Sequence, residues 1–104
     1  MAIAVLPFVT YSSLTEAVIP EDRWEDLYAS LQALKAHVQE YPGCQRFDVF
    51  VAPGADVVEV HCYTTWDTPE QRDVFLENGY TFERLLSDLG GVIAQKSATM
   101  QKVF

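Results

Sequence analysis

The side chains that could do chemistry in this 104-residue chain are few and far apart. Its two histidines, His37 and His61, are distant in sequence, and neither has a cluster of acids around it. Because a metal site needs several donors brought together, this pattern predicts no metal site. Motifs for nucleotide binding, serine hydrolysis and zinc peptidase chemistry are absent. Single side chains remain as acids or bases, and His61, Tyr63 and His37 are weak candidates.

The two cysteines, Cys44 and Cys62, are too few for a disulfide framework and lack the spacing of zinc ligands. In the hairpin register considered below, Cys44 lies opposite Thr65 and Cys62 lies opposite Phe47, so the thiols do not face each other. We therefore expect both cysteines to be reduced. A buried cysteine usually acts as a small apolar group.

Charge and composition exclude several classes of partner. The chain carries 15 acids and 7 bases, a net charge of −8, and its bases are scattered. It should repel nucleic acid and anionic membrane surfaces, and no apolar run approaches the roughly 20 residues of a membrane span. The apolar start, Met1–Phe8, lacks the basic residues of a signal peptide. We expect one globular domain, residues 1–104, in the cytoplasm.

The first part of the chain predicts a strand and then a helix. Residues from Ile3 to Val18 are β-prone, with a polar break at Ser12-Ser13. Pro20-Glu21-Asp22 is typical of a helix start, because proline suits the first turn and acids oppose the helix dipole. Pro42-Gly43 should end the helix. Apolar residues recur between them at steps of three and four, as one helical stripe of Trp24, Leu27, Leu31, Leu34, Val38 and Tyr41.

A β-hairpin is predicted from Gln45 to Trp66, turning around Ala52–Asp56. If it turns at Pro53-Gly54, Val49 can pair with Val60. One face of the hairpin is apolar and should lie under the helices: Phe47, Val49, Val51, Val58, Val60 and Cys62. The other face mixes charges with aromatic rings: Arg46, Asp48, Phe50, Glu59, His61 and Tyr63. A second copy of the chain covering that face would explain its aromatics, so we expect a homodimer.

The last third predicts a broken helix and a final strand. Thr68-Pro69-Glu70-Gln71 is a capped helix start, in which Gln71 completes a capping box. Asn78-Gly79 should interrupt this helix, and Gly90-Gly91 should end its second part. A strand should follow within Val92–Phe104. The order is βαββαβ, an α+β, ferredoxin-like fold with an antiparallel sheet.

The succession of helix stop at Tyr41–Cys44, hairpin, terminal Trp66 and capped helix resembles the antibiotic biosynthesis monooxygenase family. The resemblance implies a dimeric α+β barrel. It also matches Trp66 to a family tryptophan that lines a pocket between sheet and helices. Simple core packing is the alternative for Trp66, since tryptophans are mostly buried.

The haem-degrading members of that family use a histidine on the helix after this tryptophan and an asparagine on the first strand. Here the matching helical positions are Phe75 and Leu76, and no asparagine precedes Asn78. Without a donor there, the iron has no axial ligand. We expect no haem and no other cofactor. Further members are cofactor-free oxygenases, in which a deprotonated quinol-like substrate reduces O₂ directly.

The resemblance therefore implies a catalytic pocket without naming its base. We expect the pocket to be bounded by Trp66, Phe47, Val60, Phe75, Tyr80, Phe82 and Leu31, with Tyr80 as a gate beside the helix break. His37 and Tyr28 lie at the margins of the helical stripe. His61, opposite Asp48, is on the dimer-facing side. The predicted function is oxidation of a small hydrophobic aromatic, quinol or polyketide-like, and the alternative is a non-catalytic dimer that binds such a molecule.

Overall fold

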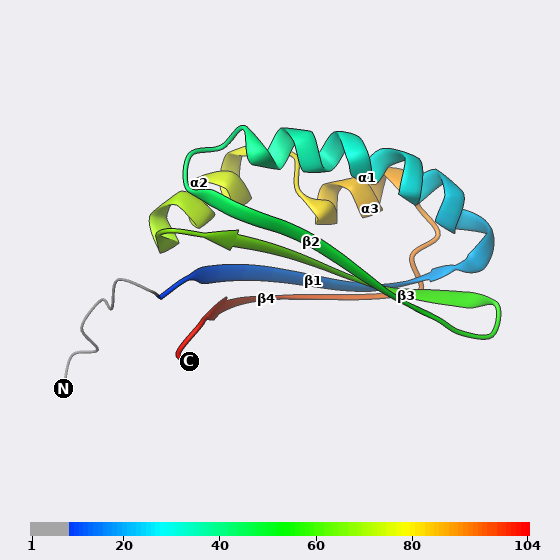
Figure 1. The fold of residues 1–104 in the computed structure, drawn as a ribbon. Coiled ribbons are helices and arrows are strands. Elements are labelled where there is room, and N and C mark those ends of the chain that lie inside the picture. The colour runs from blue at the N-terminus through cyan, green and yellow to red at the C-terminus, as the bar shows by residue number, and fades with distance from the viewer. Residues whose placement is uncertain (1–8) are drawn as a thin grey trace.

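The computed structural model describes residues 9–104. It consists of one antiparallel sheet with a layer of helices on one side (Figure 1). The elements in chain order are β1 (Tyr11–Pro20), the short 3₁₀ turn η1 (Glu21–Arg23), α1 (Trp24–Gln39), β2 (Cys44–Pro53), β3 (Val57–Trp66), α2 (Pro69–Asn78), α3 (Phe82–Leu89) and β4 (Ala94–Gln101).

The strand order is β2-β3-β1-β4, and every neighbouring pair is antiparallel. This order confirms the predicted α+β, ferredoxin-like architecture. The first strand begins at Tyr11 and continues through Pro20, later than predicted. The Ile3–Phe8 part of the predicted strand lies outside the described residues. Pro20 therefore ends β1, and η1 separates it from α1.

The predicted hairpin register was wrong by two residues. Val49 pairs with Cys62 instead of Val60, because Pro53 lies opposite Val58 and a longer loop joins the strands. Within that loop Asp56 adopts a positive φ of 63°, which a short polar residue tolerates. A shift of two residues leaves each side chain on its predicted face of the sheet.

The register also changes several predicted neighbours. Phe50, rather than Asp48, lies opposite His61. Cys44 lies opposite Trp66, next to a β-bulge between Cys44 and Arg46. The two cysteines are still not cross-strand partners, and both are free thiols.

The predicted stripe on α1 forms the helical side of the core. Leu27, Leu31, Leu34 and Val38 are buried, and Trp24 and Tyr41 pack at its ends. They meet alternate residues of β1 and β3, whose burial follows the period of two expected for a strand with one covered face. The buried sheet residues of this core are Ala17, Ile19, Val58, Val60, Cys62 and Trp66. In contrast, every residue of β4 is exposed.

The broken second helix forms as predicted, as α2 and α3, with Thr68 and Thr81 as N-caps. The Thr68 hydroxyl accepts a hydrogen bond from the Gln71 backbone N–H at 3.1 Å. The predicted capping box is only half formed, because the Gln71 side chain lies against Gly43 and its buried Oε1 accepts no hydrogen bond from a described residue. Gly43 has a φ of +85°, so glycine suits both the backbone and the close contact.

Candidate functional site

Trp66 ends β3 on the helix-covered face, and its side chain is completely buried. Its ring stacks on Phe75 of α2 with 5.3 Å between centroids and 27° between planes. Phe75 in turn makes an edge contact with Tyr41, at 5.1 Å between centroids. The two predicted pocket residues Trp66 and Phe75 therefore form one aromatic stack between sheet and helix.

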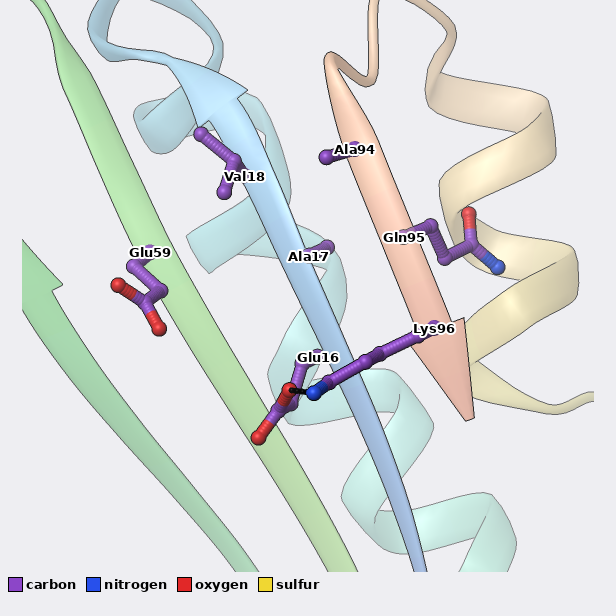
Figure 2. A pocket seen from close by; sticks show the side chains of 7 residues that line it. All are labelled: Glu16, Ala17, Val18, Glu59, Ala94, Gln95 and Lys96. Atoms are coloured by element: carbon purple, nitrogen blue, oxygen red, sulfur yellow. Dashed lines mark ion pairs between the residues drawn. The ribbon is translucent and has the colours of Figure 1, made fainter. Parts of the chain in front are cut away.

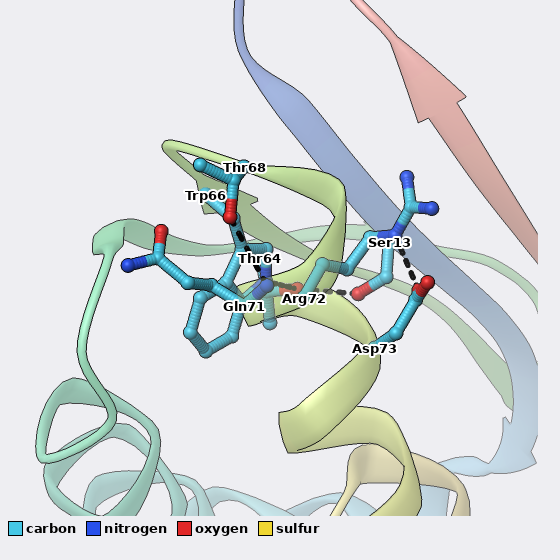
Figure 3. Close-up of polar contacts among 7 residues, drawn as sticks. All are labelled: Ser13, Thr64, Trp66, Thr68, Gln71, Arg72 and Asp73. Carbon is cyan, nitrogen blue, oxygen red and sulfur yellow. Dashed lines mark hydrogen bonds and ion pairs between the residues drawn. The ribbon is translucent and has the colours of Figure 1, made fainter.

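A pair of buried hydroxyls adjoins this stack (Figure 3). Ser13 of β1 and Thr64 of β3 lie opposite each other in the sheet, and their hydroxyl groups share a hydrogen bond. The Trp66 indole Nε1–H donates to Thr64 Oγ1 at 2.8 Å. Buried Trp N–H groups usually need such a partner, so Thr64 fixes the orientation of the Trp66 ring.

A small cavity of about 20 Å³ lies at this position, between the sheet and the helices. Of the predicted pocket residues, Phe47, Phe75 and Phe82 line it. Its other walls come from β1, α1, β3, α2 and α3: Ser13, Thr15, Leu34, Val38, Cys62, Thr64, Leu76, Thr81 and Glu83. This volume is close to that of a single water-sized site and far below the roughly 300 Å³ of a typical ligand pocket.

The other four predicted pocket residues lie outside this lining: Trp66, Val60, Leu31 and Tyr80. Trp66 stacks on the lining residue Phe75 without lining the cavity itself. Val60 and Leu31 are buried in the same core. Tyr80 lies on the surface between α2 and α3, where its hydroxyl is hydrogen-bonded to Asp88. This hydrogen bond, with smaller effects of desolvation and the Asp88 charge, raises the pKa of Tyr80. Thr81, the next residue, lines the cavity.

His37 lies beside the aromatic stack, in the last turn of α1. Its ring makes contact with Tyr41 at 5.4 Å and with Phe75 at 6.2 Å between centroids. Its Nε2 accepts a hydrogen bond from the Tyr80 backbone N–H at 2.9 Å. Because that nitrogen's lone pair is engaged, His37 fastens the α2–α3 junction to α1 and cannot accept a substrate proton there without releasing Tyr80.

His61 and Tyr63 lie on the opposite face of the sheet from Trp66. His61 Nδ1 is 3.3 Å from Glu16 of β1, and its Nε2 is 2.8 Å from Glu59 of β3. Lys96 of β4 reaches across to the same Glu16 at 3.2 Å, as Figure 2 shows. The acid partners of His61 are thus two glutamates, and the predicted pairing with Asp48 was wrong. Asp48 instead pairs with Arg46 at 3.1 Å.

Of the larger hollows on the surface, two contain candidate residues. The first, of about 420 Å³, lies on the open face and contains both candidate acid–base residues; it is lined by Arg46, Asp48, Phe50, His61, Tyr63 and Thr65. The second, of about 350 Å³, runs between α1 and β2 and includes the candidate Tyr28; it is lined by Trp24, Tyr28, Leu31, Gln32, Lys35, Phe47, Val49 and Val51. The structure therefore separates the predicted aromatic pocket from two of its three predicted catalytic residues.

Ionisable groups along the cavity are Cys62 and Glu83. Burial, helped by the charge of Asp48, raises the pKa of Cys62 to about 12, so this thiol stays protonated at neutral pH. Burial also raises the pKa of Cys44. Glu83 is exposed, and it is the carboxylate among the residues that line the cavity. Within residues 9–104 no group of three or more His, Cys, Asp or Glu side chains is placed so that it could hold a metal ion, and no helix of that range is long and apolar enough to cross a membrane.

The polar residues of the cavity were not predicted from the sequence. Ser13, Thr15 and Thr64 are buried hydroxyls on the apolar face of the sheet, and Thr81 is the N-cap of α3. One signal was available, since Ser13 and Thr15 continue the alternation of Ala17 and Ile19 in β1. Polar residues at core-facing positions of a strand indicate a specific hydrogen-bonding role.

Comparison with known proteins supports the fold over nearly the whole chain. A proposed antibiotic biosynthesis monooxygenase from Nitrosomonas europaea is similar with a TM-score of 0.69 and 17% identity, over 91% of each chain. A monooxygenase from the gene ActVA-Orf6 of Streptomyces coelicolor, solved with the ligand nanaomycin D, gives a TM-score of 0.66 and 19% identity, over 97% of this chain and 94% of that one.

A third similar structure is a proposed antibiotic biosynthesis monooxygenase from Bacillus cereus, with a TM-score of 0.67 and 14% identity over 91% of this chain and 94% of the other. The sequence itself matches no family model and no curated protein. The likeness is thus one of structure, as the order of elements in the sequence indicated. The chain has the ferredoxin-like α+β fold of the antibiotic biosynthesis monooxygenase structures.

Proposed function

We propose that this protein is a cofactor-independent monooxygenase of the antibiotic biosynthesis type, acting on a small hydrophobic aromatic such as a quinol or a polyketide-like ring. One observation carries the proposal: the Trp66–Phe75 stack and the Ser13–Thr64 hydroxyl pair meet beside the same cavity. Apolar walls with a few convergent polar groups are typical of sites that bind and orient a small molecule. The similar fold of the S. coelicolor monooxygenase supports the same assignment.

The proposed chemistry needs no external reductant. A base removes a proton from the substrate, and the resulting anion passes electrons to O₂. Where a ring CH₂ group becomes C=O, one oxygen atom enters the product and the other leaves as water with the two hydrogens. The base that we propose is Glu83, because the other ionisable group among the cavity residues, Cys62, has its pKa raised to about 12 and is protonated. A hydroxyl of Ser13 or Thr64 would donate to the substrate anion.

Substrate entry must widen the cavity, which has only about 20 Å³ of free volume. The segment that we expect to move is the junction of α2 and α3. It contributes Thr81, Phe82 and Glu83 to the cavity, and two polar contacts of Tyr80, to His37 and to Asp88, hold it in place. Short helices joined at a break are more easily displaced than a sheet, because fewer buried contacts hold them.

The catalytic test is oxygen uptake with a ring-methylene polyketide mimic, together with mass spectrometry of product formed under ¹⁸O₂. One labelled oxygen atom per product is expected. Glu83→Gln should lower kcat about a hundredfold or more, the usual contribution of a general base. Glu77→Gln, an exposed acid of α2 that does not line the cavity, is the matched control. Oxygen uptake no faster than without protein would overturn the proposal.

Binding is tested separately with nanaomycin D, the ligand of the S. coelicolor structure. It should quench tryptophan fluorescence, and Trp66→Phe should weaken binding while the protein stays folded. Trp24→Phe, the other tryptophan, is the control. If Trp66 serves only the core, Trp66→Phe should lower stability by about 1–3 kcal/mol and leave the affinity unchanged.

The second candidate function is that of a non-catalytic protein that binds a hydrophobic small molecule. The small volume of the cavity favours this alternative, because an enzyme pocket for an aromatic ring is usually larger before the substrate binds. Saturable binding of nanaomycin D without oxygen uptake from any ring-methylene or quinol probe would decide for it.

We also propose that the chain forms a homodimer through the open face of the sheet. Phe50 is 59% exposed there and packs edge-on against Tyr63 at 5.8 Å between centroids. A second sheet laid on this face would bury both rings. Light scattering should give about twice the 11.7 kDa mass of the chain at micromolar concentration, and a stable monomer would contradict the proposal.

A further inference from the structure

The helices cover the edge strand β2 less completely than its neighbour β3. Along β3 the helix-facing residues from Val58 to Trp66 are buried, whereas Phe47 and Val49 of β2 are only half-buried and Val51 is exposed. This leaves the hollow of about 350 Å³ between α1 and β2, a volume within the roughly 300–1,000 Å³ of small-molecule sites. It shares only Phe47 with the small cavity between sheet and helices, so it is a separate space.

One end of this hollow is aromatic. Trp24 and Tyr28 lie one turn apart on α1, with 5.8 Å between their ring centroids, and Tyr28 is 56% exposed. Because α1 and β2 run in opposite directions (Figure 1), this pair lies toward the Val51 end of the strand. A flat ring placed there would remove aromatic and valine carbon atoms from water, and such burial is the main source of affinity for an aromatic ligand.

The other end of the hollow is polar and positively charged. Gln32 and Lys35 line it and are neighbours on the surface of α1, since they are three residues apart. Lys35 is the one charged residue of the lining, and it forms no ion pair with a described residue. The residues three and four positions from it are also uncharged: Leu31, Gln32, Val38 and Gln39. In a chain with 15 acids and 7 bases, this is a local positive site.

We infer that the hollow between α1 and β2 binds an aromatic carboxylate, with its ring against Trp24 and Tyr28 and its carboxylate at Lys35. The inference does not rest on the proposed function. Tyr28 and Lys35 are separated by about 10 Å along the helix axis, which suits two fused rings with a short acidic side chain. Lys35 would repel a cationic ligand and would add nothing to the binding of a neutral one. The proposed homodimer uses the opposite face of the sheet, so the hollow would stay open in it.

The test is a titration of the whole protein with 2-naphthylacetate, followed by ¹H–¹⁵N NMR. The indole N–H signal of Trp24 should shift, whereas that of Trp66, which is buried and donates to Thr64, should not. Neutral 2-naphthylacetamide lacks only the charge and should bind about threefold more weakly, as expected when one exposed ion pair is lost. Added salt should reduce this difference, because it screens exposed charges.

Two pairs of variants make the result specific. Lys35→Gln should remove the preference for the acid over the amide, whereas Lys102→Gln, at an exposed lysine outside the hollow, should retain it. Tyr28→Ala should weaken the binding of both ligands about fivefold, because one aromatic contact is lost. Phe50→Ala removes an exposed ring from the opposite face of the sheet and should leave both affinities unchanged.

Three results would overturn the inference: equal affinities of the wild type for acid and amide, a shift of Trp66 in place of Trp24, or no shift of Trp24 at millimolar ligand. Signals of the hollow residues that shift on dilution of the protein alone would mean that a second copy covers the hollow, and this too would overturn it. Failure here is distinguishable from failure of the proposed function. The naphthylacetate titration reports on Trp24, whereas the proposed function is tested by oxygen uptake and by nanaomycin D binding at Trp66.

Discussion

The two faces of the sheet use the same kinds of side chain for different purposes. Phe75 packs over the covered face, buried between Trp66 and Tyr41, while Phe50 on the open face is 59% exposed. Hydroxyls of the covered face bond to one another inside the core, whereas the open face bears an ion-pair chain from Lys96 through Glu16 to His61. The covered face is complete within one chain. On the open face, the contact of Phe50 with Tyr63 and the ion pairs of Glu16 are formed, but no described residue covers them.

Side chains of the covered face therefore bear on the stability of the single chain, and side chains of the open face bear on its association with a partner. Burial on the covered face follows from contacts within one chain, so variants there should change the stability of every copy. Variants on the open face should change stability little and association more, because surface substitutions rarely cost much by themselves. Matched substitutions on the two faces can therefore test this difference between effects on stability and effects on association.

The largest expected effect is that of Phe75→Ala on the covered face. Removing this ring should lower the free energy of unfolding by about 3–5 kcal/mol, because the stack on Trp66 is lost and a void remains. Urea denaturation followed by circular dichroism measures this change. A loss below about 1 kcal/mol would mean that the helices settle into the void, and that the covered face is less rigid than its packing indicates.

Phe50→Ala is the matched substitution on the open face. Its unfolding free energy, measured at concentrations where the protein is monomeric, should change by no more than about 0.5 kcal/mol. Its dimer dissociation constant should rise at least tenfold in sedimentation experiments, since central aromatic residues dominate interface energies. Equal dissociation constants for variant and wild type would remove the open face as the interface.

The next effect is a loss of folding stability at alkaline pH, which arises from Cys62. Its pKa in the folded protein is about 12, above the ordinary thiol value of 9.0, so folding favours the protonated thiol. That contribution is fully present below about pH 9 and is lost as the pH rises toward 12, at about 1.4 kcal/mol per pH unit. Cys62→Ala should be less stable at neutral pH but should show a shallower loss between pH 9 and 11. Parallel curves for the two proteins would contradict this.

The elements and faces of the molecule could be predicted from sequence because their signals are local. The stripe from Trp24 to Tyr41 gave α1, and alternation in the hairpin placed Val60 and His61 on opposite faces. A face assignment survives a register error of two residues, as happened here. The register itself depends on the loop before Val57, where Asp56 takes a positive φ that its residue type permits but does not require.

The candidate site was less predictable because its parts are brought together by pairing across the sheet. Ser13 and Thr64 are distant in sequence, and each alone is an ordinary polar residue of a strand. The same applies to His61, whose partner Glu16 comes from β1 through a pairing that no local pattern indicates. The volume of the cavity depends on how the side chains of five elements pack, and no spacing of residues in the sequence measures it.

A smaller effect is expected at the helix caps, on the covered side. Thr68→Ala removes the hydroxyl that accepts from the Gln71 N–H at 3.1 Å and should cost about 1 kcal/mol. Thr81→Ala removes the corresponding cap of α3, with its acceptor 3.3 Å from the Arg84 N–H. Because Thr81 also lines the cavity, only this second variant should alter nanaomycin D binding. Equal changes in nanaomycin D affinity for both variants would mean that the ligand does not bind at the cavity.

The smallest effect on unfolding should come from Lys96→Ala on the open face. The Lys96 side chain is 80% exposed, and its contact with Glu16 at 3.2 Å is therefore screened by water. Loss of this pair should change the unfolding free energy of the monomer by less than about 1 kcal/mol, and less again in high salt. Lys102→Ala removes an exposed lysine that forms no ion pair with a described residue, and so controls for the change in net charge. In the dimer the Lys96–Glu16 pair would lie against the partner, where desolvation strengthens the interaction between charges. The dissociation constant should then rise more for Lys96→Ala than for Lys102→Ala. If both variants associate as the wild type does, Lys96 and Glu16 remain in water, and the proposed interface must be confined to the part of the open face around Phe50.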